Sequence, residues 1–168
     1  MVTTARNYPG ESASRSGNFA IWVSRFPLIA ATAIFTAIST RFLLDPVHSA
    51  AARGIVFSSN AGITVARVGF GAFPLAFAII LLTCLVSRRR ILLGIYMVLT
   101  IDAVALAVRT IGMVIDNSVK ENIPVLAPEI ALLIVSLIAL NVELRRRKKE
   151  TEPVPAALDK IRGDFRNA

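Results

Sequence analysis

Four long apolar stretches dominate the chain, and short polar or basic segments separate them. Each stretch approaches or exceeds the roughly 18–20 residues that a helix needs to cross about 30 Å of hydrocarbon. No stretch alternates between apolar and polar positions as a barrel strand does, and an open sheet cannot satisfy its edge hydrogen bonds in lipid. The pattern predicts an all-α fold, a four-helix transmembrane bundle with spans at 26–44, 61–86, 91–115 and 124–144.

Polar signals mark the segments outside the spans. Asp45 and Pro46 suit the cap and the first turn of a helix, so we expect a short interfacial helix in the outer loop, ending near Gly54. The polar run 58–60 is able to cap the second span. Near the end of the chain, 156–165 is expected to form a brief amphipathic helix.

Three regions follow from this pattern. The opening residues are rich in Ser, Thr, Arg and Gly and lack apolar periodicity, so we expect them to be disordered. The expected regions are a disordered cytoplasmic N-terminal segment at 1–25, a four-span membrane domain at 26–144 and a basic cytoplasmic tail at 145–168.

Basic residues gather in three of the segments outside the spans. The N-terminal segment holds three arginines, the turn 87–90 holds three more, and the tail opens with five consecutive basic residues, whereas the other two loops hold only Arg53 and Lys120. Four crossings place the three basic segments on one side. The positive-inside rule therefore predicts a multi-pass membrane protein with both termini in the cytoplasm.

The composition agrees with a bilayer as the main partner. Of the 168 residues, 55% are hydrophobic and only 18% are charged, which disfavours an ordinary soluble domain. A net charge of +8 would indicate nucleic acid in a soluble protein, but here the charges follow the positive-inside pattern. Because no nucleic-acid-binding motif accompanies them, we do not expect nucleic acid as a partner.

The first span also resembles a cleavable signal peptide, with 47–49 as a weak cleavage site. The 25 residues before it form an unusually long basic region for such a peptide, which favours a retained span. The single cysteine, Cys84, excludes an intrachain disulfide, and the single histidine, His48, excludes a multi-histidine metal site. We therefore predict no metal and no cofactor.

Charged residues inside the spans are the candidate chemistry of this chain, because each costs about 2.5–3.5 kcal/mol at a helix centre. Three of them lie roughly 8–9 Å below the outer interface at 1.5 Å per residue, so Glu129 is able to accept from Arg67, Arg109 or both. Two arginines against one glutamate would favour an anionic ligand. The candidate ligand-binding residues are Arg67, Asp102, Arg109 and Glu129.

Asp102 differs from the other three because it lies near mid-bilayer, about 10.5 Å from Arg109 along the same helix face. It is expected either to be protonated and hydrogen-bonded or to line a wet pocket. In the second span, helical steps from Arg67 reach Gly71 and Pro74. These two residues and Gly69 are expected to allow close helix packing, with a kink at the proline.

Two motifs carry a resemblance to a known family. The run 66–72, Ala-Arg-Val-Gly-Phe-Gly-Ala, is similar to that family's Glu-Arg-Ala-x-Tyr-Gly-Gly, and Arg109 is followed by Asp116 and later by 128–130, Pro-Glu-Ile. The sequence thus resembles an uncharacterised bacterial family of four-span membrane proteins, a domain of unknown function, and more distantly the oxidase-accessory DoxX-type proteins. The resemblance covers 26–144 and implies no known activity, and alanines replace the family's glutamate and second glycine.

Three classes of function remain open from the sequence. We favour a non-enzymatic membrane protein that binds a small amphipathic or lipid-like ligand, such as an anionic lipid, or that assists a membrane complex. One alternative is a membrane-embedded isomerase or redox accessory enzyme with Asp102 or Glu129 as proton donor or acceptor. The other is a small proton-coupled exporter, since such coupling requires an intramembrane acid. An oligomer is compatible with each class.

Overall fold

The computed structural model describes residues 10–151, with side chains described at 21–120 and 122–148. Its three uninterrupted long helices are α1 (Gly10–Leu44), α5 (Ile91–Ile115) and α6 (Val119–Thr151). The other long helical segment is divided into α3 (Asn60–Ala66), the π-helical turn η1 (Arg67–Ala72) and α4 (Phe73–Val86). A short helix, α2 (Pro46–Ala51), precedes it, and the described residues contain no strand.

Four of these segments are long and apolar enough to cross a membrane, which confirms the predicted all-α four-helix bundle. They are Ile21–Leu44, Asn60–Val86, Ile91–Ile115 and Asn122–Lys148, with mean hydropathies from 1.6 to 2.4. Much of their apolar surface faces outward, including Trp22, Phe73 and Val108, which are more than half exposed. Such a surface requires lipid around it, so the chain is a multi-pass membrane protein.

The terminal helices extend beyond the predicted spans. The helix α1 begins at Gly10, so residues 10–25, for which no regular structure was expected, are helical. At the other end, α6 continues through the basic run to Thr151. A helix that is already nucleated gains one hydrogen bond for each residue added, which favours such extensions. The residues before Gly10 and the expected helix at 156–165 lie outside the described residues.

The short helix α2 forms where the polar signals predict it. The Asp45 side chain accepts a hydrogen bond from the His48 backbone N–H at 3.1 Å, and Pro46 occupies the first turn. The chain then reverses at Gly54, whose φ of +75° lies in the left-handed region that favours glycine. Ser59 caps α3 in the same way, since its hydroxyl accepts from the Gly62 N–H at 3.2 Å.

The π-helical turn η1 precedes Pro74, where a kink was expected. Because proline has no backbone N–H, the carbonyl four residues earlier cannot make its normal helical hydrogen bond. In a π turn each N–H bonds to the carbonyl five residues earlier, so the helix continues without a break. The side chains after the turn point in a different direction around the helix axis than they would in a regular α-helix. The second span therefore changes the direction of its faces at this point.

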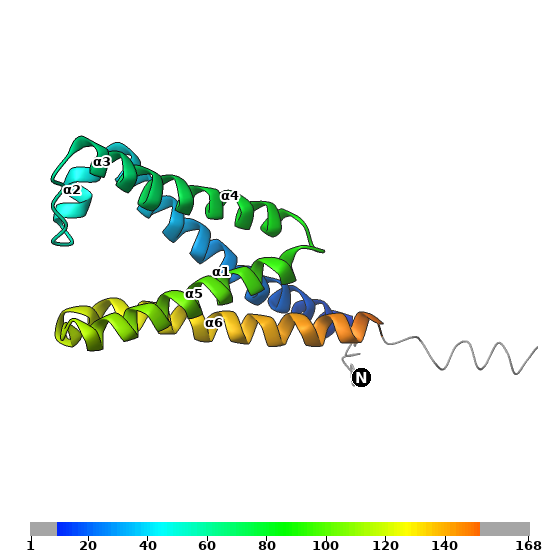
Figure 1. The fold of residues 1–168 in the computed structure, drawn as a ribbon. Helices are drawn as coiled ribbons and strands as arrows, with labels where there is room; N and C mark the ends of the chain where they lie inside the picture. The colour runs from blue at the N-terminus through cyan, green and yellow to red at the C-terminus, as the bar shows by residue number, and fades with distance from the viewer. Residues whose placement is uncertain (1–9, 152–168) are drawn as a thin grey trace, which may run out of the picture.

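The long helices form two pairs, α1 with α4 and α5 with α6. Helix α1 joins the pairs, because it also contacts α5 and α6. Figure 1 shows the pairs close together near the start of α1 and diverging toward the end that carries α2. The end where the pairs are close together is called the closed end, and one hydrophobic cluster lies there, with the buried members Leu28, Cys84, Ile91, Ile95 and Ala139. A second cluster lies nearer the middle, with the buried members Ala31, Leu81 and Val98.

Gly94 permits the closest helix approach at the closed end. A Cβ atom added there would lie 2.7 Å from Leu28 Cδ2 on α1 and 2.9 Å from Cys84 Cβ on α4. Distances below 3 Å are not tolerated between carbon atoms, so α5 fits against both neighbours only because residue 94 has no side chain. Gly94 is not among the packing residues predicted from the sequence.

Candidate functional site

A cavity of about 910 Å³ lies between the diverging helix pairs. Most of its walls come from α1, α5 and α6, and the loop after α2 and Phe70 of η1 also contribute to the lining. Most of the lining side chains are apolar, such as Ile34, Phe35 and Leu132. The polar lining residues that carry charge or an amide are Arg53, Asp102, Arg109, Asn122 and Glu129.

Arg109 and Glu129 form an ion pair across α5 and α6. Arg109 Nη2 donates to Glu129 Oε1 at 2.7 Å, and Arg109 Nε donates to both carboxylate oxygens, at 2.9 Å to Oε2 and 3.1 Å to Oε1. The two side chains are 32% and 20% exposed. The predicted contact between these residues is confirmed, while their role in ligand binding stays a prediction.

Asp102 lies deeper in the same cavity and has an oxygen without a partner. The residue is 7% exposed, and its Oδ2 is buried with no hydrogen-bond partner among the described residues. Asp102 makes no hydrogen bond to Arg109 within the described part of the chain, as the two-turn separation predicts. A buried carboxyl oxygen without a partner is costly, so the Asp102 carboxyl group, which lines the cavity, retains unused hydrogen-bonding capacity there.

Arg53 covers one edge of the cavity from the loop after α2. Its guanidinium carbon lies 5.4 Å from the centre of the Phe42 ring, and its Nη1 donates to the Ser49 carbonyl at 3.0 Å. These two contacts hold a cation near the cavity, with no acidic partner among the side chains that the structure describes. The sequence indicated Arg53 only as a loop charge, because its contact with Phe42 depends on how α2 packs on α1.

Arg67 does not join the ion pair, which corrects the expectation from depth alone. It is exposed, does not line the cavity and makes no ion pair with any described residue. Two features separate Arg67 from the ion pair. The helix pairs diverge at this end (Figure 1), and η1 changes which residues share a face, because residues four apart do so in an α-helix but residues five apart do so in a π turn. Ala66 and Gly71 are accordingly the buried pair, and Arg67 is turned outward.

The expected packing residues of the second span behave differently from one another. A Cβ on Gly71 would come within 2.9 Å of Leu43 Cγ, so Gly71 allows α1 to approach closely. Gly69 does not take part in packing, because a Cβ there would meet nothing within 4 Å. Pro74 is partly buried and directly follows η1, where it removes a backbone donor.

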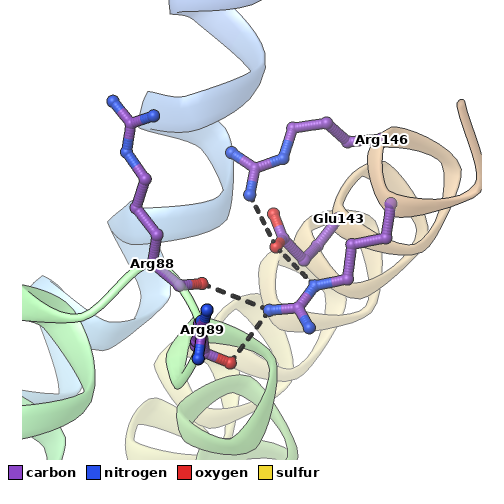
Figure 2. Close-up of polar contacts among 5 residues, drawn as sticks. Arg88, Arg89, Glu143 and Arg146 are labelled. Atoms are coloured by element: carbon purple, nitrogen blue, oxygen red, sulfur yellow. Dashed lines mark hydrogen bonds and ion pairs between the residues drawn. The ribbon is translucent and has the colours of Figure 1, made fainter. Parts of the chain in front are cut away.

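A second polar cluster lies at the opposite end of the bundle and was not predicted. Glu143 on α6 is fully buried and accepts from Arg146 Nη2 at 2.9 Å and from Arg147 Nε at 3.0 Å. Figure 2 shows Glu143 facing the turn that carries Arg88 and Arg89. The sequence places this acid one residue before the predicted end of the fourth span, which gave no reason to expect burial.

Among the described residues, no group of three or more His, Cys, Asp or Glu side chains is arranged to hold a metal ion. Comparisons with family models, curated proteins and solved structures found no match for this chain. The fold and the cavity define a multi-pass helical membrane protein with a partly polar internal space.

Proposed function

We propose that this protein binds a small amphipathic or lipid-like ligand in the cavity between α1, α5 and α6. The observation that carries the proposal is a largely apolar cavity lined by Asp102, an almost buried acid whose Oδ2 has no hydrogen-bond partner among the described residues. The volume of about 910 Å³ is within the roughly 300–1,000 Å³ of small-molecule sites. A ligand with an apolar body would fill the walls, and its hydrogen-bond donor would meet Asp102.

The ion pair contributes orientation rather than net charge. Arg109 and Glu129 neutralise one another, and Arg67, which would have supplied an excess positive charge, faces away from the cavity. Arg53, which also lines the cavity, remains as a cation there, while Asp102 favours a ligand whose head donates a hydrogen bond. Glu129 uses both carboxylate oxygens on Arg109, which leaves Asp102 as the better acceptor for the ligand.

The location that we propose is the bacterial inner membrane, with both termini in the cytoplasm. The basic turn 87–90 and the basic part of α6 lie at the same end of the bundle, since Arg147 donates to backbone carbonyls of that turn. Such clustering supports an orientation set by the positive-inside rule. Membership of the uncharacterised four-span family, with its distant DoxX-type likeness, remains a proposal that rests on the motifs at 66–72 and 128–130.

The test is to purify the protein in a mild detergent and identify small molecules that co-purify with it by mass spectrometry. We expect a specific apolar compound with the wild type, strongly reduced in Asp102→Asn because the NH₂ group of the amide opposes a ligand donor. Asp116→Asn is the matched control, because Asp116 is exposed and outside the cavity. Identical bound compounds in all three proteins, or none in the wild type, would contradict the proposal.

A further inference from the structure

The end of the bundle opposite the cavity joins two basic segments that are far apart in the sequence. Arg147 Nη2 donates to the backbone carbonyls of Arg88, at 3.2 Å, and Arg89, at 3.1 Å. In Figure 2 the Arg88 carbonyl faces this contact, while its guanidinium extends away from Glu143. The turn between α4 and α5 is thus fixed to the end of α6 through backbone atoms, and its side chains remain available.

Glu143 holds this junction in place. Its buried carboxylate accepts from both Arg146 and Arg147, so the two guanidinium groups are oriented before any ligand arrives. A buried carboxylate with charged donors is worth more than an exposed pair, because water competes less. Glu143 therefore acts as a positioning residue for the arginines around it.

The combined surface carries a large excess of positive charge. Within 87–90 and 143–148 there are seven arginine and lysine side chains and one carboxylate, Glu143. Arg88, Arg89 and Arg90 are exposed, and none of them forms an ion pair with a side chain that the structure describes. Such an excess requires an anion to neutralise it, and arginine forks match the geometry of a phosphate group.

The position of this surface indicates where the phosphate comes from. Val86, directly before the turn, is 80% exposed, and Leu144, directly before the basic run of α6, is 43% exposed. Exposed apolar residues at the end of a membrane span require acyl chains beside them. The arginines that follow therefore lie at the level of the lipid headgroups.

We propose that the turn 87–90 and residues 143–148 form one binding site for the phosphate headgroup of an anionic phospholipid. The acyl chains of that lipid lie against Val86 and Leu144, and the phosphate accepts from the exposed arginines of the turn. Glu143 and Arg147 keep the two halves of the site together. This proposal is independent of the ligand in the cavity, because the site is at the other end of the bundle.

The experiment measures binding of phosphatidylglycerol and phosphatidylcholine to the full chain in detergent by native mass spectrometry. We expect the wild type to prefer phosphatidylglycerol and the double variant Arg88→Gln/Arg89→Gln to lose about fivefold in affinity for each arginine removed. The control is Arg41→Gln/Lys120→Gln, which removes the same charge from exposed positions outside the site. Equal losses in both double variants, or no preference for phosphatidylglycerol, would overturn the proposal.

Glu143→Gln distinguishes a site built by positioned arginines from general electrostatic attraction, because the two predict opposite changes in affinity for phosphatidylglycerol. The variant raises the net charge by one, so simple electrostatic attraction to an anionic lipid would increase. If Glu143 positions Arg146 and Arg147 as we propose, affinity for phosphatidylglycerol falls instead. Tighter binding by the variant would contradict the positioning role and with it the built site.

A final arm distinguishes a lipid from a soluble phosphate compound. Inorganic phosphate at millimolar concentration should not displace phosphatidylglycerol from the wild type, because it lacks the acyl chains that contact Val86 and Leu144. Displacement at that concentration would show that the site recognises free phosphate and would overturn the assignment to a lipid.

Discussion

Arg109 and Glu129 are coupled through three hydrogen bonds but are still partly exposed toward the cavity. Pairs of this kind contribute little compared with an apolar replacement, yet removing one partner leaves the other charge without compensation. The pair also fixes α6 relative to α5 beside the cavity. Its strength therefore bears on both the stability of the protein and the shape of the site.

We expect Arg109→Gln and Glu129→Gln each to lower stability in detergent by about 1–3 kcal/mol, because each leaves one charge unpaired. The double variant should be more stable than the sum of the two losses implies. Thermal unfolding of the four proteins measures this coupling as a double-mutant cycle. Strictly additive losses would show that the two residues do not stabilise one another.

The sequence was sufficient to predict the contact between Arg109 and Glu129 but not the position of Arg67. Depth follows from residue counts, and all three residues were placed correctly with respect to their spans. The direction in which a side chain points around the helix axis depends on the local number of residues per turn. The π-helical turn η1, which begins at Arg67, changes that number. A pattern analysis that assumes α-helical periodicity cannot detect this rotation.

At the level of the helices, close approach at Gly94 determines how α5 sits against α1 and α4. The Cβ of Cys84 is the first atom of its side chain, so it cannot move away unless the backbone of α4 moves too. Leu28, the other neighbour, is fully buried and has little room to change its rotamer. An additional methyl group at position 94 must therefore displace a helix.

Gly94→Ala should destabilise the protein by about 1–3 kcal/mol through overpacking. Gly69→Ala is the matched control, since nothing lies within 4 Å of the added atom and alanine is the better helix former. The measurement is the midpoint of thermal unfolding in the same detergent. A midpoint for Gly94→Ala equal to or above that of Gly69→Ala would contradict the packing argument.

The sequence predicted the extent of the helices more completely than their arrangement. Apolar length defines each span, and the cap at Asp45 and the turn at Gly54 have local signals. Nothing comparable indicated that Gly94 is a contact point or that Gly69 is not, because both are glycines in apolar surroundings. In lipid the hydrophobic effect does not drive apolar helix faces together, so close packing decides which faces contact one another.

For the whole molecule, the structure places the turn 87–90 and the loop after α2 at opposite ends of the bundle (Figure 1). If the basic end is cytoplasmic as proposed, the loop containing Ser58 is outside and Ser87 is inside. The single native cysteine, Cys84, is buried, so introduced cysteines provide the reactive thiols in a Cys84→Ala background.

A membrane-impermeant maleimide added to intact cells should label Ser58→Cys, and it should label Ser87→Cys only after the membrane is permeabilised. Mass spectrometry or a gel-shift reagent detects the modification. The Cys84→Ala parent, which contains no thiol, is the control. Labelling of Ser87→Cys but not Ser58→Cys from outside would show that the orientation is reversed.

The central place of α1 has a consequence for biogenesis. A ribosome makes α1 before the other described helices, whereas α6, one of its neighbours in the finished bundle, is made after them. Until then the face of α1 that α6 will cover must be shielded by lipid or by the insertion machinery. Synthesis that stops after the third span would release an insertion intermediate with that face open, a natural substrate for membrane quality-control proteases.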